Sequence, residues 1–155
     1  GAPLGSGKLW ANKATIETNL VAALVQIETA LEMFKKSGSG HLVLISSVLG
    51  NKGVAGVKAA YAASKAGVSS LGESLRAEYS SGPIKVTVIE PGYIESEMTA
   101  KSESTMLMVD NETGVRKMVD AIERETGRAI VPGWPWIPLV AMLKALPPRF
   151  TKPFA

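Results

Sequence analysis

The segment HLVLIS, His41–Ser46, holds a continuous apolar run of strand length. Such runs are typical of strands that helices bury on both faces, whereas a half-exposed strand alternates apolar and polar residues. Two further runs follow along the chain, IKVTVIE at Ile84–Glu90 and a short one at Ala129–Val131. These three segments predict the strands of a parallel sheet.

Helical segments alternate with these strands. Between Lys13 and Lys36 the apolar residues recur at steps of three and four, which is the spacing of an amphipathic helix. We expect two more helices, from Ala59 to about Tyr79 and over Glu112–Arg124. The alternation predicts an α/β fold with a parallel sheet. Right-handed crossovers would place the carboxyl ends of the strands and the N-termini of the following helices at one edge, where open α/β sheets bind ligands.

Three chemically active side chains are expected at that edge. Ser47 follows the first strand, and Tyr61 and Lys65 lie four residues apart on one face of the next helix. A phenol has a pKa of about 10, so proton exchange near pH 7 needs a shift of about 3 units, worth about 4 kcal/mol. A lysine ammonium beside the phenolate favours that shift. With a serine hydroxyl to bind a carbonyl oxygen, the set suits protonation of an oxygen while another group attacks its carbon.

Three motifs carry a resemblance to a known family. They are LISSVLG at Leu44–Gly50, YAASKAGVSSL at Tyr61–Leu71 and VIEPGYIESEM at Val88–Met98. In this order and spacing they resemble the classical short-chain dehydrogenases/reductases, over about residues 9 to 131. The resemblance implies a Rossmann-type, doubly wound parallel sheet. It also implies an oxidoreductase that interconverts a small-molecule carbonyl and an alcohol by hydride transfer, with NAD or NADP as cofactor.

The resemblance further implies roles for individual residues. It makes Tyr61 the catalytic acid/base and Ser47 the residue that positions the substrate oxygen. Lys65 would lower the pKa of Tyr61 and bind the nicotinamide ribose. Asn19, in the segment ETNL, matches the helix asparagine that holds a water in the family's proton relay. A solvent-facing position on its helix is the alternative for Asn19.

The turn after the second strand matches the family's nicotinamide-binding turn. The expected cofactor-binding residues are Tyr61, Lys65, Pro91, Gly92, Ile94 and Ser96. Ser96 stands where the family usually has threonine, which keeps the hydroxyl. A nearby apolar group either lines a substrate pocket or is ordinary packing: Met98, Met106, Leu107 and Met108.

The chain departs from the family pattern in two respects. The loop between Ser47 and Tyr61 looks one residue longer than the common spacing. The family's glycine-rich dinucleotide loop and Asn-Asn-Ala-Gly strand, which would precede Gly1, are not in the sequence. We therefore expect the C-terminal part of a longer Rossmann-type enzyme, inactive on its own and unable to bind either cofactor measurably. A non-catalytic interaction module with the same fold is the alternative.

Composition excludes several other classes of protein. The chain of 155 residues has no cysteine and a single histidine, His41, so no metal site is expected. The net charge is +3 and the basic residues are scattered, which does not indicate a nucleic-acid surface. No apolar run approaches the roughly 20 residues of a membrane-spanning helix. We expect a cytoplasmic protein.

The last segment, Pro132–Ala155, is an apolar extension rich in proline and tryptophan that follows a catalytic domain over residues 1–131. Pro135 and Pro138 should keep its start from being a regular helix, while Leu139–Leu146 can form about two turns. Packing across a subunit contact or over the substrate cleft is favoured over a membrane interface. The helices at 13–36 and 59–79 carry surplus apolar surface, and the resemblance implies a homodimer or homotetramer.

Overall fold

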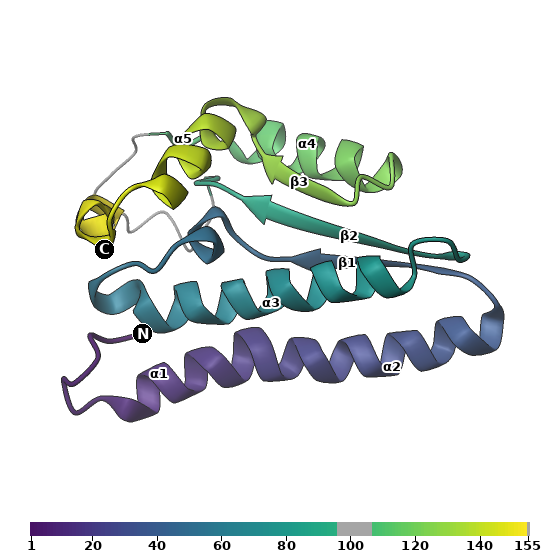
Figure 1. Cartoon of the computed structure of the whole chain (residues 1–155), viewed down its shortest axis with the longest axis horizontal. Helices are drawn as coiled ribbons and strands as arrows, with labels where there is room; N and C mark the ends of the chain where they lie inside the picture. The colour runs from purple at the N-terminus through teal and green to yellow at the C-terminus, as the bar shows by residue number, and fades with distance from the viewer. Residues whose placement is uncertain (96–106, 155) are drawn as a thin grey trace.

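The computed structural model describes residues 1–95 and 107–154, in which helices flank a three-stranded parallel sheet (Figure 1). The strands are β1 (Gly40–Ile45), β2 (Ile84–Pro91) and β3 (Arg128–Val131), in the order β1-β2-β3. Both pairs are parallel, with Leu42 opposite Val86 in the first. The predicted parallel strands and α/β class are confirmed, with strand ends within one residue of expectation.

The first helical segment is longer than the sequence predicts and contains an irregular turn. It consists of α1 (Leu9–Ile16), a π-helical turn (Glu17–Val21) and α2 (Ala22–Ser37). The segment ends at Gly38, whose φ of 80° is a left-handed conformation that glycine adopts without strain. Asn19 lies inside the π-helical turn, and such turns are frequent at functional sites.

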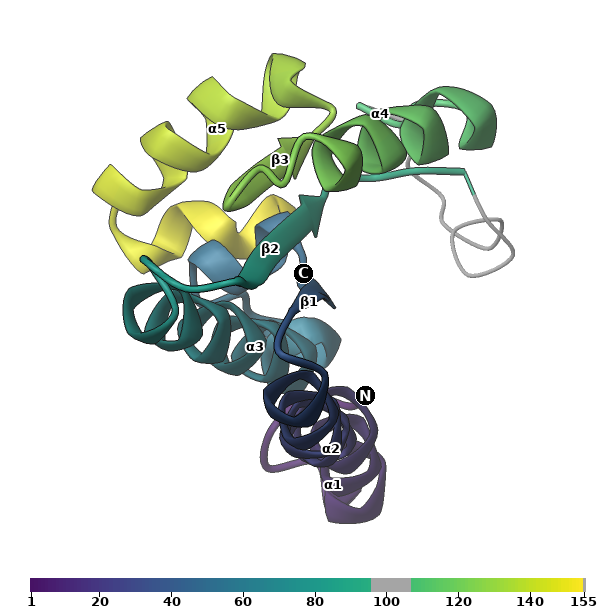
Figure 2. The same cartoon turned by 90° about the vertical axis from the view of Figure 1, so that its right-hand side faces the viewer.

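Helix α3 (Ala59–Glu78) packs closely on one face of the sheet. A Cβ added at Gly72 would lie 2.2 Å from Cγ2 of Val88, so the absence of a side chain lets helix and strand approach. Helix α2 lies on the same side, next to α3 (Figure 2). The buried apolar cluster between these elements consists of Ile27, Leu31, Leu42, Leu44, Val68, Ile84 and Val86.

Helix α4 (Asn111–Glu123) covers the opposite face, where Ile89, Ala121 and Val131 form a second cluster (Figure 2). The strands advance in one direction while α3 and α4 lie on opposite faces, so the two crossovers have opposite hands. The expectation that both are right-handed is therefore wrong for one of them. The preference for right-handed crossovers arises when a helix follows its strand directly. It is weaker here because the long connection 92–110 separates α4 from β2.

The C-terminal segment forms helix α5 (Gly133–Ala145), followed by 3₁₀ turns at Pro148–Phe154. The backbone is non-helical at Trp134 (φ −96°, ψ 134°), so the start of this helix is irregular, as its prolines predict. The regular part nevertheless begins before the predicted Leu139, because Pro135 and Pro138 both lie in its first turn, where few helix N–H groups have partners. Trp136 is only 1% exposed and packs with Val140 on the chain's own core. The division into a domain and an extension stays a prediction.

Strand β1 is less buried than its sequence predicts. Leu42 and Leu44 are buried toward α3, but Ile45 is 47% exposed on the other face. Helix α4 covers β2 and β3, so the end of β1 extends beyond it among the described residues. Within the described ranges, no helix is long and apolar enough to cross a membrane.

Candidate active site

A pocket of about 540 Å³ lies at the carboxyl edge of the sheet. Five of the sequence-predicted site residues line it together: Ser47, Tyr61, Pro91, Gly92 and Ile94. They come from the end of β1, the first turn of α3 and the turn after β2. Parallel strands bring these segments to one edge, as the fold class predicts.

Ser47 lies in extended conformation immediately after β1 and caps the 3₁₀ turn Val48–Asn51. Its Oγ accepts a hydrogen bond from the backbone N–H of Leu49 over 3.2 Å. The same hydroxyl lies near enough to the Tyr61 phenol to influence the pKa of that group. Because a backbone donor already occupies one lone pair of Oγ, the hydroxyl proton is left for the phenol or for a bound oxygen.

Tyr61 is the third residue of α3 and is half-buried at the pocket wall. Burial raises its pKa above the usual value of 10.0, and the hydrogen bond from Ser47 opposes that rise. A negative charge on neighbouring Tyr93 would raise the pKa further. The phenol is therefore held in its protonated form at neutral pH, as a proton donor.

Lys65 lies one helical turn after Tyr61 but does not line the pocket. Its Nζ donates to the carbonyl oxygen of Ile45 over 3.0 Å and lies 5.8 Å from the centre of the Tyr61 ring. Burial lowers the pKa of Lys65 itself. The ammonium is thus held by a strand-end carbonyl, and Lys65 is not among the groups that shift the pKa of Tyr61 here. The lowering of the Tyr61 pKa by Lys65, which the family resemblance implies, stays a prediction.

Asn19 contacts α3 rather than the pocket. Its Nδ2 donates to Ser64 Oγ over 3.2 Å, and Ser64 Oγ donates to the carbonyl oxygen of Tyr61 over 2.7 Å. The alternative of a purely solvent-facing Asn19 is therefore wrong. The structure joins Asn19 to the backbone of Tyr61 through one serine.

The turn after β2 is held by the sheet and by α5. The backbone N–H of Gly92 donates to the carbonyl oxygen of Val131 over 2.8 Å. A Cβ at Gly92 would lie 2.1 Å from Trp136 Nε1, so the indole presses directly on this turn. Tyr93 meets the same indole edge-on, with ring centroids 5.3 Å apart. Ser96 lies outside the described residues.

The rest of the pocket wall is mainly apolar. Leu49, Val57, Met108, Val115 and Met118 line it. Met108 is thus on the pocket, Leu107 packs in the cluster around Trp136, and the other two methionines predicted near it lie outside the described residues. The wall suits an apolar substituent beside a polar reacting group.

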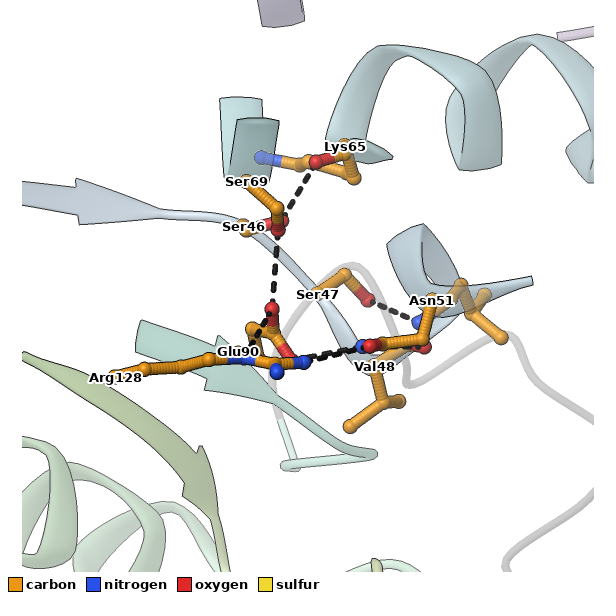
Figure 3. Close-up of polar contacts among 9 residues, drawn as sticks. Ser46, Ser47, Val48, Asn51, Lys65, Ser69, Glu90 and Arg128 are labelled. Carbon is orange, nitrogen blue, oxygen red and sulfur yellow. Dashed lines mark hydrogen bonds and ion pairs between the residues drawn. The ribbon is translucent and has the colours of Figure 1, made fainter. Parts of the chain in front are cut away.

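Sequence reasoning missed a buried polar network around Glu90 (Figure 3), the residue that directly precedes the pocket-lining Pro91. The carboxylate of Glu90, 1% exposed, receives Arg128 Nη2 over 2.8 Å and Nε over 3.1 Å. This contact raises the pKa of Arg128. A signal was present in the sequence, because a glutamate inside the apolar run VTVIEPG cannot be buried without a partner.

Comparisons with known proteins agree with the motif order. The family model described as short chain dehydrogenase matches residues 6–107. The chain is 80% identical over all 155 residues to an uncharacterized oxidoreductase of Mycobacterium tuberculosis strain H37Rv, and covers 61% of that protein. It is 35% identical over 136 residues, 87% of the chain, to an uncharacterized oxidoreductase of Myxococcus xanthus, and covers 53% of that protein. The chain thus spans about three fifths or less of the length of these relatives.

A solved structure with the same arrangement is a short chain dehydrogenase from Burkholderia cenocepacia in complex with NADP. It superposes with a TM-score of 0.79 at 21% identity, over 96% of this chain and 62% of that one. At this identity the likeness establishes the fold.

Proposed function

This chain belongs to the short-chain dehydrogenase family, and we propose that the protein is an NAD- or NADP-dependent oxidoreductase acting on a small carbonyl or alcohol. The observation that carries the proposal is the placement of two hydroxyls, those of Ser47 and Tyr61, on the wall of one pocket. The same pocket includes the Pro91–Gly92 turn. A proton donor, a polarising hydroxyl and a cofactor-binding turn thus face one space.

The residues at the pocket fit the nicotinamide half of such a cofactor. Gly92 presents backbone without a side chain, and Pro91 and Ile94 lie on either side of it along the pocket wall. We assign nicotinamide contact to these residues and to Ser96, and the ribose hydroxyls to Tyr61 and Lys65. The bound reduced cofactor supplies a hydride to the carbonyl carbon.

The chain's own residues then handle the oxygen and its proton. Ser47 donates a hydrogen bond to the substrate oxygen, which polarises the C=O bond. Tyr61 transfers its phenolic proton to that oxygen as negative charge develops there, which completes the alcohol. The raised pKa of Tyr61 keeps the phenol protonated at neutral pH, which is the form that donates a proton in carbonyl reduction. Asn19 is assigned to the relay that returns a proton to Tyr61, through its contact with the first turn of α3.

We also propose that the protein assembles as a homodimer or homotetramer through α1 and α2. Several large apolar side chains of this segment are strongly exposed: Leu9, Trp10, Val21, Val25 and Met33. An apolar patch of this kind is unusual on the surface of a monomer. None of these exposed residues lines the pocket, so a partner there would leave the pocket open. The cytoplasmic location stays a prediction.

The test compares the full-length protein with its Tyr61→Phe and Ser47→Ala variants. Oxidation of NADH or NADPH is followed with a panel of apolar ketones and aldehydes, and cofactor binding by protein fluorescence. We expect Tyr61→Phe to abolish turnover while binding is retained, and Ser47→Ala to lose about 10²–10⁴-fold. Near wild-type turnover in Tyr61→Phe would contradict the mechanism. Absence of both binding and turnover in the wild type would favour the non-catalytic interaction module.

A further inference from the structure

We infer that Glu90, Arg128 and Asn51 form a positioning device that fixes the 3₁₀ turn carrying Ser47 at the proposed active site. None of the three lines the pocket, so they act through other residues. The inference rests on the proposed function for its catalytic consequence. Its structural part, the anchoring of the turn, stands on contacts alone (Figure 3).

The first step is the buried ion pair. Glu90 precedes the Pro91–Gly92 turn directly, and its carboxylate is 1% exposed. Arg128, on the neighbouring strand β3, approaches it with two guanidinium nitrogens in fork geometry. Such a two-point contact fixes orientation as well as distance. A carboxylate in this location costs free energy unless it is paired, so the pair itself is held in place.

The second step links this pair to the 3₁₀ turn. Asn51 is the last residue of the turn that Ser47 caps. Its Oδ1 accepts from Arg128 Nη2 over 2.6 Å, and its Nδ2 donates to Glu90 Oε2 over 2.7 Å. The same Nδ2 lies 3.3 Å from the carbonyl oxygen of Val48, inside the turn. One amide group thus anchors the turn to both members of the ion pair.

The third step is a second arm from the same carboxylate. Ser69 Oγ donates to Glu90 Oε1 over 3.1 Å and lies 2.7 Å from Ser46 Oγ. Ser46 Oγ is also 2.8 Å from the carbonyl oxygen of Lys65. This arm holds the residue before Ser47 against α3. The carboxylate of Glu90 therefore restrains Ser47 from both sides in the sequence, through Ser46 and through Asn51.

The consequence is a requirement for precise placement of the Ser47 hydroxyl. The hydroxyl is aimed by the N–H of Leu49 within the same turn, so any shift of the turn moves it relative to Tyr61. Displacement of a catalytic group by about 1 Å costs about 10²-fold in rate. Cofactor affinity should change little, because the nicotinamide-binding turn is held separately by Val131.

Asn51→Ala is the informative variant, because it releases the turn while leaving the Glu90–Arg128 pair intact. In the full-length protein we expect kcat to fall about 10- to 100-fold, with the KM for NADH or NADPH unchanged within about twofold. Hydrogen exchange at the backbone amides of Leu49 and Gly50 should become faster, since they bond to Ser47 inside the turn. This exchange measurement needs no catalytic activity.

Arg128→Lys provides a second variant that keeps the charge but loses the fork. We expect it to show the same pattern in milder form. Arg116→Lys is the matched control, because Arg116 pairs with Glu112 on the exposed face of α4. It should change neither kcat nor the exchange of Leu49 and Gly50.

Two results would overturn the inference. Unchanged exchange at Leu49 and Gly50 in Asn51→Ala would show that the turn needs no anchor. Faster exchange with unchanged kcat would show that the anchor does not position Ser47. A wild-type protein with no oxidoreductase activity would count against the proposed function instead, and the exchange data would still decide whether the turn is anchored.

Discussion

The contact between Gly92 and Trp136 gives a prediction that links the C-terminal helix to the candidate active site. Trp136 is 1% exposed, and its ring atoms lie only 2.1–2.5 Å from where a Cβ at Gly92 would be. The indole is rigid and enclosed by the apolar cluster around Val48 and Leu49, so it cannot move aside easily. The two residues should therefore be strongly coupled in stability.

The magnitudes follow from the packing. Gly92→Ala inserts a methyl group into filled space and should destabilise the fold by about 1–3 kcal/mol. Trp136→Ala removes a buried indole, which typically costs about 3–5 kcal/mol. We expect the lower end, because Nε1 of Trp136 has no hydrogen-bond partner among the described residues and its removal relieves that cost. In the double variant the new methyl group enters the cavity left by the indole. Its destabilisation should therefore be about 1–2 kcal/mol smaller than the sum of the two single destabilisations.

Urea unfolding of the wild type, both single variants and the double variant, followed by far-UV circular dichroism, measures this coupling. Trp134→Ala is the matched control, because Trp134 is 80% exposed, lies only two residues away and should shift the urea midpoint very little. Additive effects of the Gly92 and Trp136 substitutions would refute the packing argument. An unchanged urea midpoint in Trp136→Ala would show that α5 is not part of the folded core.

Further predictions concern titration, assembly and the proton relay. Because burial raises the pKa of Tyr61 above 10.0, its contribution to stability is complete below pH 10 and is lost as pH rises through the folded-state value. The urea midpoint should therefore fall less between pH 9 and pH 11 in Tyr61→Phe than in the wild type, and an equal fall in both proteins would contradict this. Val25→Glu, at a position 61% exposed on α2, should reduce the oligomer to monomers in light scattering, with Lys35→Glu as control; a monomeric wild type at micromolar concentration would refute the assembly. Asn19→Ala should lower kcat about 10-fold or more with little change in the KM for cofactor, and an unchanged kcat would remove Asn19 from the relay.

The sequence alone determined the order and type of the elements and most of the residues that meet at the pocket. Apolar runs and three-to-four spacing are local properties, so β1, β2, β3 and α3 could be predicted within a residue or two. The motif order also predicted that both hydroxyls lie at one edge of the sheet. Ser47 follows a strand and Tyr61 opens the next helix, and in a parallel sheet these ends meet at the carboxyl edge. The prolines of α5 predicted its irregular start, but not that Pro138 lies inside the helix.

Packing in three dimensions sets which face each helix covers and which partner each buried polar group finds. The opposite placement of α3 and α4 depends on packing across the whole sheet, and no local pattern encodes it. A glutamate at position 90, inside an apolar strand, predicts a partner for its carboxylate but does not identify it. That partner, Arg128, lies 38 positions away and reaches Glu90 only because β2 and β3 pair. The raised pKa of Tyr61 likewise follows first from burial, which is a property of the assembled fold. Local free-energy preferences select the elements, whereas desolvation and long-range contacts select their partners.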